Sequence, residues 1–236
     1  MKLSCSLLLL ISLIIPNMTL AGEKDVYEFS WLDPDKEVYV LQNRKFRKAN
    51  NLHVNVGYGL TTSGAFVDST AIQARGGYFF TEDWGFEVMY SKNSGEENDT
   101  FKSVVATVGG SGTTPFRRIV QNYYGVMGLW SPFYTKINTF NKIAYMDWIF
   151  GLGYGQLTEQ NNKTRFDNQG TINDNQITEE SHSGILWTAA MKFYLDQTWS
   201  IRADFTGMYY SATEPKLNKS SMITHYDATL SLGFGF

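Results

Sequence analysis

Residues 224–236 read THYDATLSLGFGF, and this stretch decides the fold class. Its bulky or apolar side chains occupy every second position, namely Tyr226, Ala228, Leu230, Leu232, Phe234 and Phe236. Small or polar residues fill the positions between them. Successive side chains of a β-strand point to opposite faces, so the pattern predicts a strand with one apolar face and one small or polar face.

Seven further segments alternate with the same period of two. They are residues 52–60, 71–80, 84–92, 119–130, 144–157, 184–195 and 199–211, and the alternation is least regular in 119–130. Most reach the roughly 9–11 residues that a tilted strand needs to cross a bilayer. The even number of segments predicts an all-β fold, an eight-stranded antiparallel transmembrane up-and-down β-barrel over residues 51–236.

The expected connections alternate in length. Three-residue turns follow the second and sixth segments, at 81–83 and 196–198, and a link of about a dozen residues follows the fourth. Longer polar stretches follow the others, above all 93–118 and 158–183. Short turns on one side and long loops on the other are typical of outer-membrane barrels, with the turns in the periplasm and the loops outside the cell.

The two short turns have similar sequences. Residues 78–84 read YFFTEDW and residues 193–199 read FYLDQTW, so aromatic side chains precede each turn and a tryptophan follows it. Aromatic rings favour the headgroup level of a membrane, which predicts an aromatic belt at this end of the barrel.

The first 21 residues have the features of a secretory signal peptide. Lys2 is followed by an apolar run over 7–15, and cleavage is expected near Ala21. We therefore expect export to the bacterial outer membrane. Residues 22–50 would form a periplasmic N-terminal segment that begins acidic and ends basic, where it could meet anionic headgroups.

The composition excludes several classes of protein. Without Lys2 the chain keeps 19 basic and 23 acidic residues, a balance that does not favour nucleic-acid binding. The only cysteine, Cys5, lies in the signal peptide, so neither disulfides nor thiolate chemistry are expected. No cofactor is expected. The expected partners are outer-membrane lipids and a surface partner at the long loops.

Two motifs carry a family resemblance. They are VYVLQNRKFRK at Val38–Lys48 and SPFYTKI at Ser131–Ile137, the second expected at the turn after the fourth strand. The strand plan resembles small barrels of the OmpA, OmpX and OmpW type, and the motifs resemble the outer-membrane β-barrel domain family of myxobacteria and predatory bacteria. The resemblance implies that the barrel-assembly machinery recognises the last strand, through Tyr226, Leu230, Leu232, Phe234 and Phe236. It implies no established chemistry.

Seven charged residues fall on the inward face of the expected barrel. They are Arg75, Glu87, Asp147, Lys192, Arg202, Asp204 and Asp227, three positive against four negative. The short turns place Glu87 opposite Gly77 and Lys192 opposite Arg202. Two cations side by side destabilise a sheet, so Asp204 and Asp227 are expected to neutralise them. Because an eight-stranded barrel is just wide enough for its side chains, the sequence predicts a salt-bridged plug, with a narrow gated pore as the alternative.

Catalytic patterns are weak in this sequence. No spacing among His53, His182 and His225 matches a metal site, so no metal ligands are predicted. Ser181-His182-Ser183, with Glu179 and Glu180, has the residue types of a serine hydrolase, but neighbours on one strand point to opposite faces. We therefore expect a non-catalytic envelope protein that interacts through its long outer loops, with a lipid-modifying enzyme as the lesser alternative.

Overall fold

The computed structural model describes residues 44–62, 64, 66–107, 116–139, 142–163, 177–214 and 219–236. The expected signal peptide, most of the segment 22–50 and the middle of both long loops lie outside these residues. The chain divides into two compact units, Met1–Lys45 and Phe46–Phe236, and the second contains the whole sheet.

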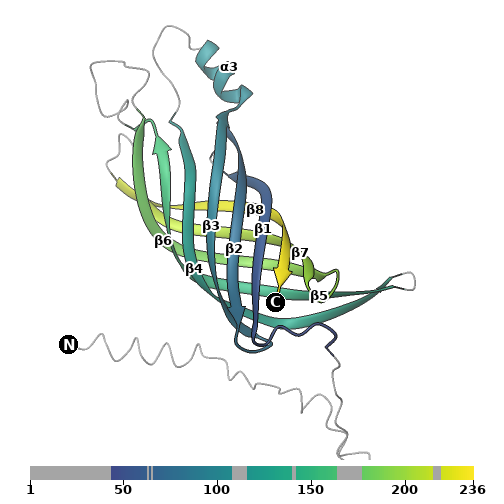
Figure 1. The fold of residues 1–236 in the computed structure, drawn as a ribbon. Coiled ribbons are helices and arrows are strands. Elements are labelled where there is room, and N and C mark those ends of the chain that lie inside the picture. The colour runs from purple at the N-terminus through teal and green to yellow at the C-terminus, as the bar shows by residue number, and fades with distance from the viewer. Residues whose placement is uncertain are drawn as a thin grey trace, which may run out of the picture. The chain divides into compact units, whose positions relative to one another are not determined.

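The second unit is a closed barrel of eight antiparallel strands (Figure 1). The strands are β1 (Asn51–Thr62), β2 (Val67–Phe79), β3 (Trp84–Glu97), β4 (Arg118–Thr139), β5 (Lys142–Asn161), β6 (Thr178–Tyr194), β7 (Trp199–Glu214) and β8 (Lys219–Gly235). Each strand pairs with its neighbour in the chain, and β1 pairs with β8 to close the ring. The predicted eight-stranded antiparallel up-and-down barrel and its strand order are confirmed.

Alternation along each strand separates the two surfaces of the barrel as predicted. Side chains such as Leu60, Leu152 and Leu230 lie on the outer surface with 68%, 66% and 61% of their area exposed. Polar side chains such as Glu87 and Asp147 are completely buried inside. A barrel with an apolar outside and a charged inside has the reverse polarity of a water-soluble protein, and it is the arrangement that an apolar solvent stabilises.

The strands are longer than their apolar patterns. β1 and β2 leave only residues 63–66 between them, and β7 and β8 leave only 215–218, so the predicted longer loops after these strands are wrong. Polar residues such as Thr62 and Ser69 continue the ladder beyond the apolar band, because backbone pairing does not need apolar side chains. The two ends of the barrel are called here the turn end, at 80–83 and 195–198, and the loop end.

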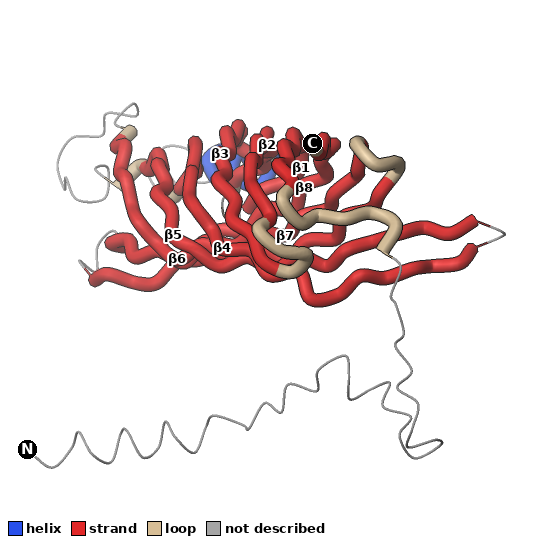
Figure 2. Tube along the Cα trace, turned by 60° about the horizontal axis from the view of Figure 1, so that its bottom comes forward, coloured by secondary structure: helices blue, strands red, loops and turns tan. Residues whose placement is uncertain are grey.

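The largest departure from prediction lies between β4 and β5. The expected link of about a dozen residues is instead strand, because β4 continues to Thr139 and β5 begins at Lys142. The two strands form a long hairpin that extends past the other strands at the turn end (Figures 1 and 2). The ladder shifts register between Trp130 and Phe133, which accommodates Pro132 in a bulge. The motif Ser131–Ile137 therefore lies within β4, not at a turn.

The two short turns are closed in the same way. The Thr81 hydroxyl accepts hydrogen bonds from the backbone N–H of Asp83 and Trp84, at 3.3 and 3.0 Å. The Asp196 carboxylate accepts from the N–H of Thr198 and Trp199, at 2.8 and 2.6 Å. Side chains of this kind replace backbone partners in tight turns, which explains the repeated sequence.

Part of the first long loop is helical. Residues Asp99–Thr107 form α3, which begins after Asn98, whose side-chain oxygen accepts a hydrogen bond from Phe101 N at 3.0 Å. Among the described residues no helix is both long and apolar enough to cross a bilayer.

Candidate functional site

Glu87 forms the centre of an ion-pair network inside the barrel. Its carboxylate accepts hydrogen bonds from Arg75 Nη1 at 2.9 Å and from Arg202 Nη1 at 2.5 Å. His53 Nε2 lies 3.1 Å from the same carboxylate. The Glu87 side chain has no exposed area, and these partners come from β1, β2 and β7. One carboxylate on β3 is thus held by three other strands.

The contact between Glu87 and Arg202 crosses the lumen. In a ring of eight strands, β3 and β7 lie four places apart in either direction, so they form opposite walls. Arg202 also places Nη2 2.8 Å from Asp204 Oδ1. The network therefore fills the width of the barrel, as the interior of an eight-stranded barrel permits.

Arg75 links this network to polar side chains nearer the loop end. Its Nη2 donates to Thr206 Oγ1 at 2.6 Å and to Gln73 Oε1 at 3.0 Å. Gln73 Nε2 in turn donates to Asp227 Oδ2 at 2.8 Å. Polar contacts thus continue from the Glu87 layer toward the loop end.

Asp227 lies at the part of this network nearer the loop end, together with Tyr123 and His225. Its carboxylate accepts a hydrogen bond from Tyr123 OH, and His225 Nε2 lies 3.0 Å from its Oδ1. The expectation that Asp227 neutralises Lys192 and Arg202 is wrong. Asp227 pairs with Thr206 in the β7–β8 ladder, four residues beyond Arg202, and such a separation along a strand is roughly 13 Å.

Lys48 is a member of the lumen network that the sequence reasoning missed. Its Nζ lies 3.0 Å from Asp147 Oδ2 and donates to Ser131 Oγ at 2.6 Å, and its side chain is 3% exposed. Lys48 was expected in a periplasmic segment near lipid headgroups, whereas its side chain enters the turn end of the barrel. With Lys48 included, the lumen set becomes four cations and four carboxylates.

Lys192 faces inward opposite Arg202, as predicted. Its other neighbour across the sheet is Asp147. Its Nζ lies 5.0 Å from the centre of the Tyr194 ring, and among the described residues no carboxylate lies within 4 Å of it. Asp204 neutralises Arg202, as predicted, but forms no ion pair with Lys192.

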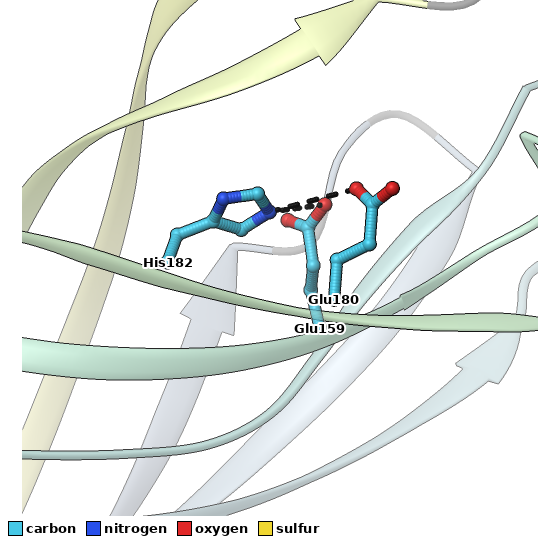
Figure 3. A group of neighbouring side chains, drawn as sticks. All are labelled: Glu159, Glu180 and His182. Carbon is cyan, nitrogen blue, oxygen red and sulfur yellow. Dashed lines mark ion pairs between the residues drawn. The ribbon is translucent and has the colours of Figure 1, made fainter.

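A second polar group lies at the loop end. His182 Nε2 lies 3.4 Å from Glu159 Oε1 and 3.6 Å from Glu180 Oε2 (Figure 3). Linear spacing gave no sign of this group, because the β5–β6 register rather than the sequence brings Glu159 opposite Glu180. The three side chains are of the types that bind a metal ion.

Cations and amides already surround these carboxylates. Arg118 Nε donates to Glu159 Oε1 at 2.7 Å, and Lys163 Nζ lies 3.6 Å from Glu180 Oε1. Asn161 Nδ2 donates at 3.2 Å to both glutamates. The charges of the two glutamates are thus balanced by Arg118 and Lys163. A group with no net charge attracts a divalent cation only weakly.

The residues of the suspected hydrolase set are not arranged for catalysis. Ser181 and Ser183 are exposed on the outer face of β6, whereas His182 points inward. The alternation predicted from the sequence therefore separates the hydroxyl groups from the imidazole, and no serine–histidine relay forms here.

The predicted assembly residues lie on the outer face of β8 and at its end. Leu230, Leu232, Phe234 and Phe236 expose 61%, 51%, 39% and 63% of their area, and Tyr226 is half-buried. Their role in assembly stays a prediction. Trp84, Trp130 and Trp199 are exposed at the same turn end, where Trp84 and Trp130 stack at 6.2 Å, in agreement with the predicted belt.

The chain is similar to several solved barrels. The N-terminal β-barrel domain of Pseudomonas aeruginosa OprF shows 15% identity, 80% coverage of this chain and 98% of that chain, with a TM-score of 0.45. Yersinia pestis Ail is 14% identical, with 80% of this chain and 99% of that chain covered and a TM-score of 0.40. P. aeruginosa OprG is 12% identical, with 81% and 98% of the two chains covered and a TM-score of 0.44. Similarity at this level concerns the barrel fold alone.

No family model and no curated protein matches the chain. The predicted small-barrel architecture rests on the strand pairing of this chain itself. The closer resemblance to the myxobacterial family is not confirmed and stays a prediction.

Proposed function

We propose that this protein is a non-catalytic outer-membrane β-barrel with a closed lumen. The observation that carries the proposal is the fully buried Glu87, which pairs with Arg75 on the neighbouring strand and with Arg202 on the opposite wall. Opening a pore there would break these ion pairs, and an unpaired buried charge costs several kcal/mol. The closed barrel therefore favours a structural or interaction role over the gated pore.

The outer surface supports membrane insertion. Apolar side chains with roughly half of their area exposed, such as Val56, Ile72 and Val126, form a band around the barrel, with exposed fractions of 56%, 58% and 54%. Tryptophan and phenylalanine gather at the turn end, where a headgroup region would begin. Outer-membrane lipids are the partner that this surface fits, and the barrel-assembly machinery is the partner expected for β8.

Interaction with a surface partner is then expected at the loop end. The expected long stretches 93–118 and 158–183 are partly strand, with β3 reaching Glu97 and β5 reaching Asn161. The polar rim formed by Arg118, Glu159, Glu180 and His182 lies at the same end. This end would face the medium if the short turns lie in the periplasm.

Fractionation together with conductance tests the proposal. The full-length protein should appear in the outer-membrane fraction, migrate with heat-modifiable mobility and give no stable channel in planar bilayers. A stable open state in the unmutated protein would favour the narrow pore. Hydrolysis of a lipid ester by the purified barrel that is lost in His182→Ala would favour the enzyme.

A further inference from the structure

The turn end of the barrel contains a cavity of about 330 Å³ with a positive lining. Arg47, Lys48, Lys192 and His53 contribute to its walls, together with polar groups such as Thr198 and Ser200. The described residues around it include no aspartate and no glutamate. The volume lies at the lower end of the range for ligand sites, roughly 300–1,000 Å³.

The local charges around this cavity are not balanced. Asp147 lies 3.0 Å from Lys48 and faces Lys192 across the β5–β6 ladder. The Glu82 carboxylate accepts hydrogen bonds from the backbone N–H of Lys48 and Ala49, at 3.1 and 3.4 Å. Glu87 and Asp204 are engaged by Arg75 and Arg202.

Lys192 is the buried cation of this cavity that forms no direct ion pair among the described residues. Lys192 is 9% exposed. Among the described side chains, none accepts a hydrogen bond from its ammonium group and no carboxylate lies within 4 Å of it. The neighbour on its other side is Arg202, a like charge. Because a buried charge without compensation is costly, an anion that enters the cavity would be bound.

The rim of the cavity is apolar on the side of the outer surface. Leu52, Trp199 and Phe234 line it and expose 46%, 43% and 39% of their area on the face that the proposed membrane would cover. A ligand with a phosphate group and an acyl chain would place the charge beside Lys192 and the chain along these side chains.

We propose that the turn-end cavity binds a phosphate-bearing anion, with Lys192 as its central cation and Arg47 at its entrance. An anionic phospholipid headgroup uses both the cationic walls and the apolar rim, whereas free phosphate uses the walls alone. The lipid form of this proposal rests on the proposed membrane location, and the site itself does not depend on whether the lumen conducts.

The experiment uses the full-length barrel, folded in a neutral detergent and freed of lipid. Short-chain phosphatidylglycerol, zwitterionic phosphatidylcholine of the same chain length, and inorganic phosphate are titrated separately, and binding is measured by calorimetry and native mass spectrometry. Lys192→Gln removes the central charge, and Lys136→Gln removes an exposed charge from the β4–β5 hairpin as the matched control. Arg47→Gln, at an exposed position, is a second variant with little risk to folding.

Saturable binding of phosphatidylglycerol that weakens roughly tenfold or more in Lys192→Gln, by less in Arg47→Gln and not in Lys136→Gln is the expected result. Phosphate binding with the same pattern and no preference for the lipid would support the site and assign it to the free anion. Absence of saturable binding, or equal binding by the protein and Lys192→Gln, would overturn the proposal. Heat-modifiable mobility confirms that each variant is folded, and conductance tests the proposed function separately.

Discussion

Glu87 on β3 and Arg202 on β7 meet across the interior of the barrel, with 2.5 Å between Glu87 Oε2 and Arg202 Nη1. The two residues are far apart in the chain and lie on opposite walls. Their contact joins strands that share no backbone hydrogen bonds. We therefore expect it to affect both the stability of the barrel and the closure of the lumen.

Glu87→Gln should destabilise the barrel strongly, because Arg75 and Arg202 would lose their common charged partner. Removing one member of a buried ion pair typically costs about 3–5 kcal/mol. The free energy of unfolding in urea, measured with the barrel in lipid vesicles, checks this value. Glu96→Gln, at an exposed position on the same strand, is the control and should change it little. Equal effects of both substitutions would show that the network does not stabilise the fold.

Lys48 and Asp147 should be energetically coupled, since Lys48 Nζ lies 3.0 Å from Asp147 Oδ2 in a buried setting. A double-mutant cycle with Lys48→Met and Asp147→Asn should give a coupling energy of roughly 0.5–3 kcal/mol in unfolding experiments. The same cycle with Arg47→Met in place of Lys48→Met should give none, because Arg47 is exposed. A coupling of zero for Lys48 would remove it from the lumen network.

Gly153 should not tolerate a side chain. A Cβ at this position would lie 1.9 Å from Val126 O and 2.7 Å from Met127 Cα, so β4 and β5 would have to separate. Gly153→Ala should lower the free energy of unfolding by at least about 1–3 kcal/mol. Gly128→Ala on the facing strand is the control, because its Cβ would lie 3.9 Å from the nearest atom, Leu152 O. Similar losses in both variants would contradict the observed packing of these strands.

The turn at Asp196 should contribute a pH-dependent part of the stability. The N–H groups of Trp199 and Thr198 hold the pKa of the Asp196 carboxyl below its ordinary value. A lowered pKa in the folded state stabilises the protein above the unfolded pKa, and this stabilisation is lost as the pH falls through the folded pKa. Asp196→Asn should therefore reduce the loss of stability on acidification, measured from unfolding midpoints at several pH values.

The matching turn supplies the control for that experiment. The Thr81 hydroxyl accepts the corresponding backbone hydrogen bonds but does not titrate. Thr81→Ala should lower the unfolding midpoint by the same amount at every pH. A pH profile that Asp196→Asn leaves unchanged would show that this carboxylate does not couple to folding.

Much of the lumen could be predicted from the sequence. The period of two placed Glu87, Arg202 and Lys192 inside, and the length of the turn at 196–198 fixed Lys192 opposite Arg202. Both arguments use only neighbouring strands. The partners of each charge depend on contacts across the barrel, which neither periodicity nor turn length determines. For that reason the sequence alone pairs Asp227 with Lys192 and Arg202, whereas its partners are Tyr123 and His225.

The remaining differences between the predicted and the observed structure come from segments without a regular alternation of apolar and polar residues. Lys48 lies before the first strand, so no alternation could place its side chain in the barrel. The bulge at Pro132 interrupts the pattern of β4, and the strand beyond it was predicted as a link. The proximity of Glu159, Glu180 and His182 follows from the register of the polar ends of β5 and β6, which the alternation pattern does not determine.

Single-channel recording of the purified, unmutated barrel in planar bilayers tests the central claim most directly. A lumen closed by Glu87, Arg75 and Arg202 predicts no stable open state above leak, while Glu87→Ala/Arg202→Ala, which removes both sides of the crossing contact, should raise the ion current if it remains folded. A stable open state of the unmutated barrel would contradict the account.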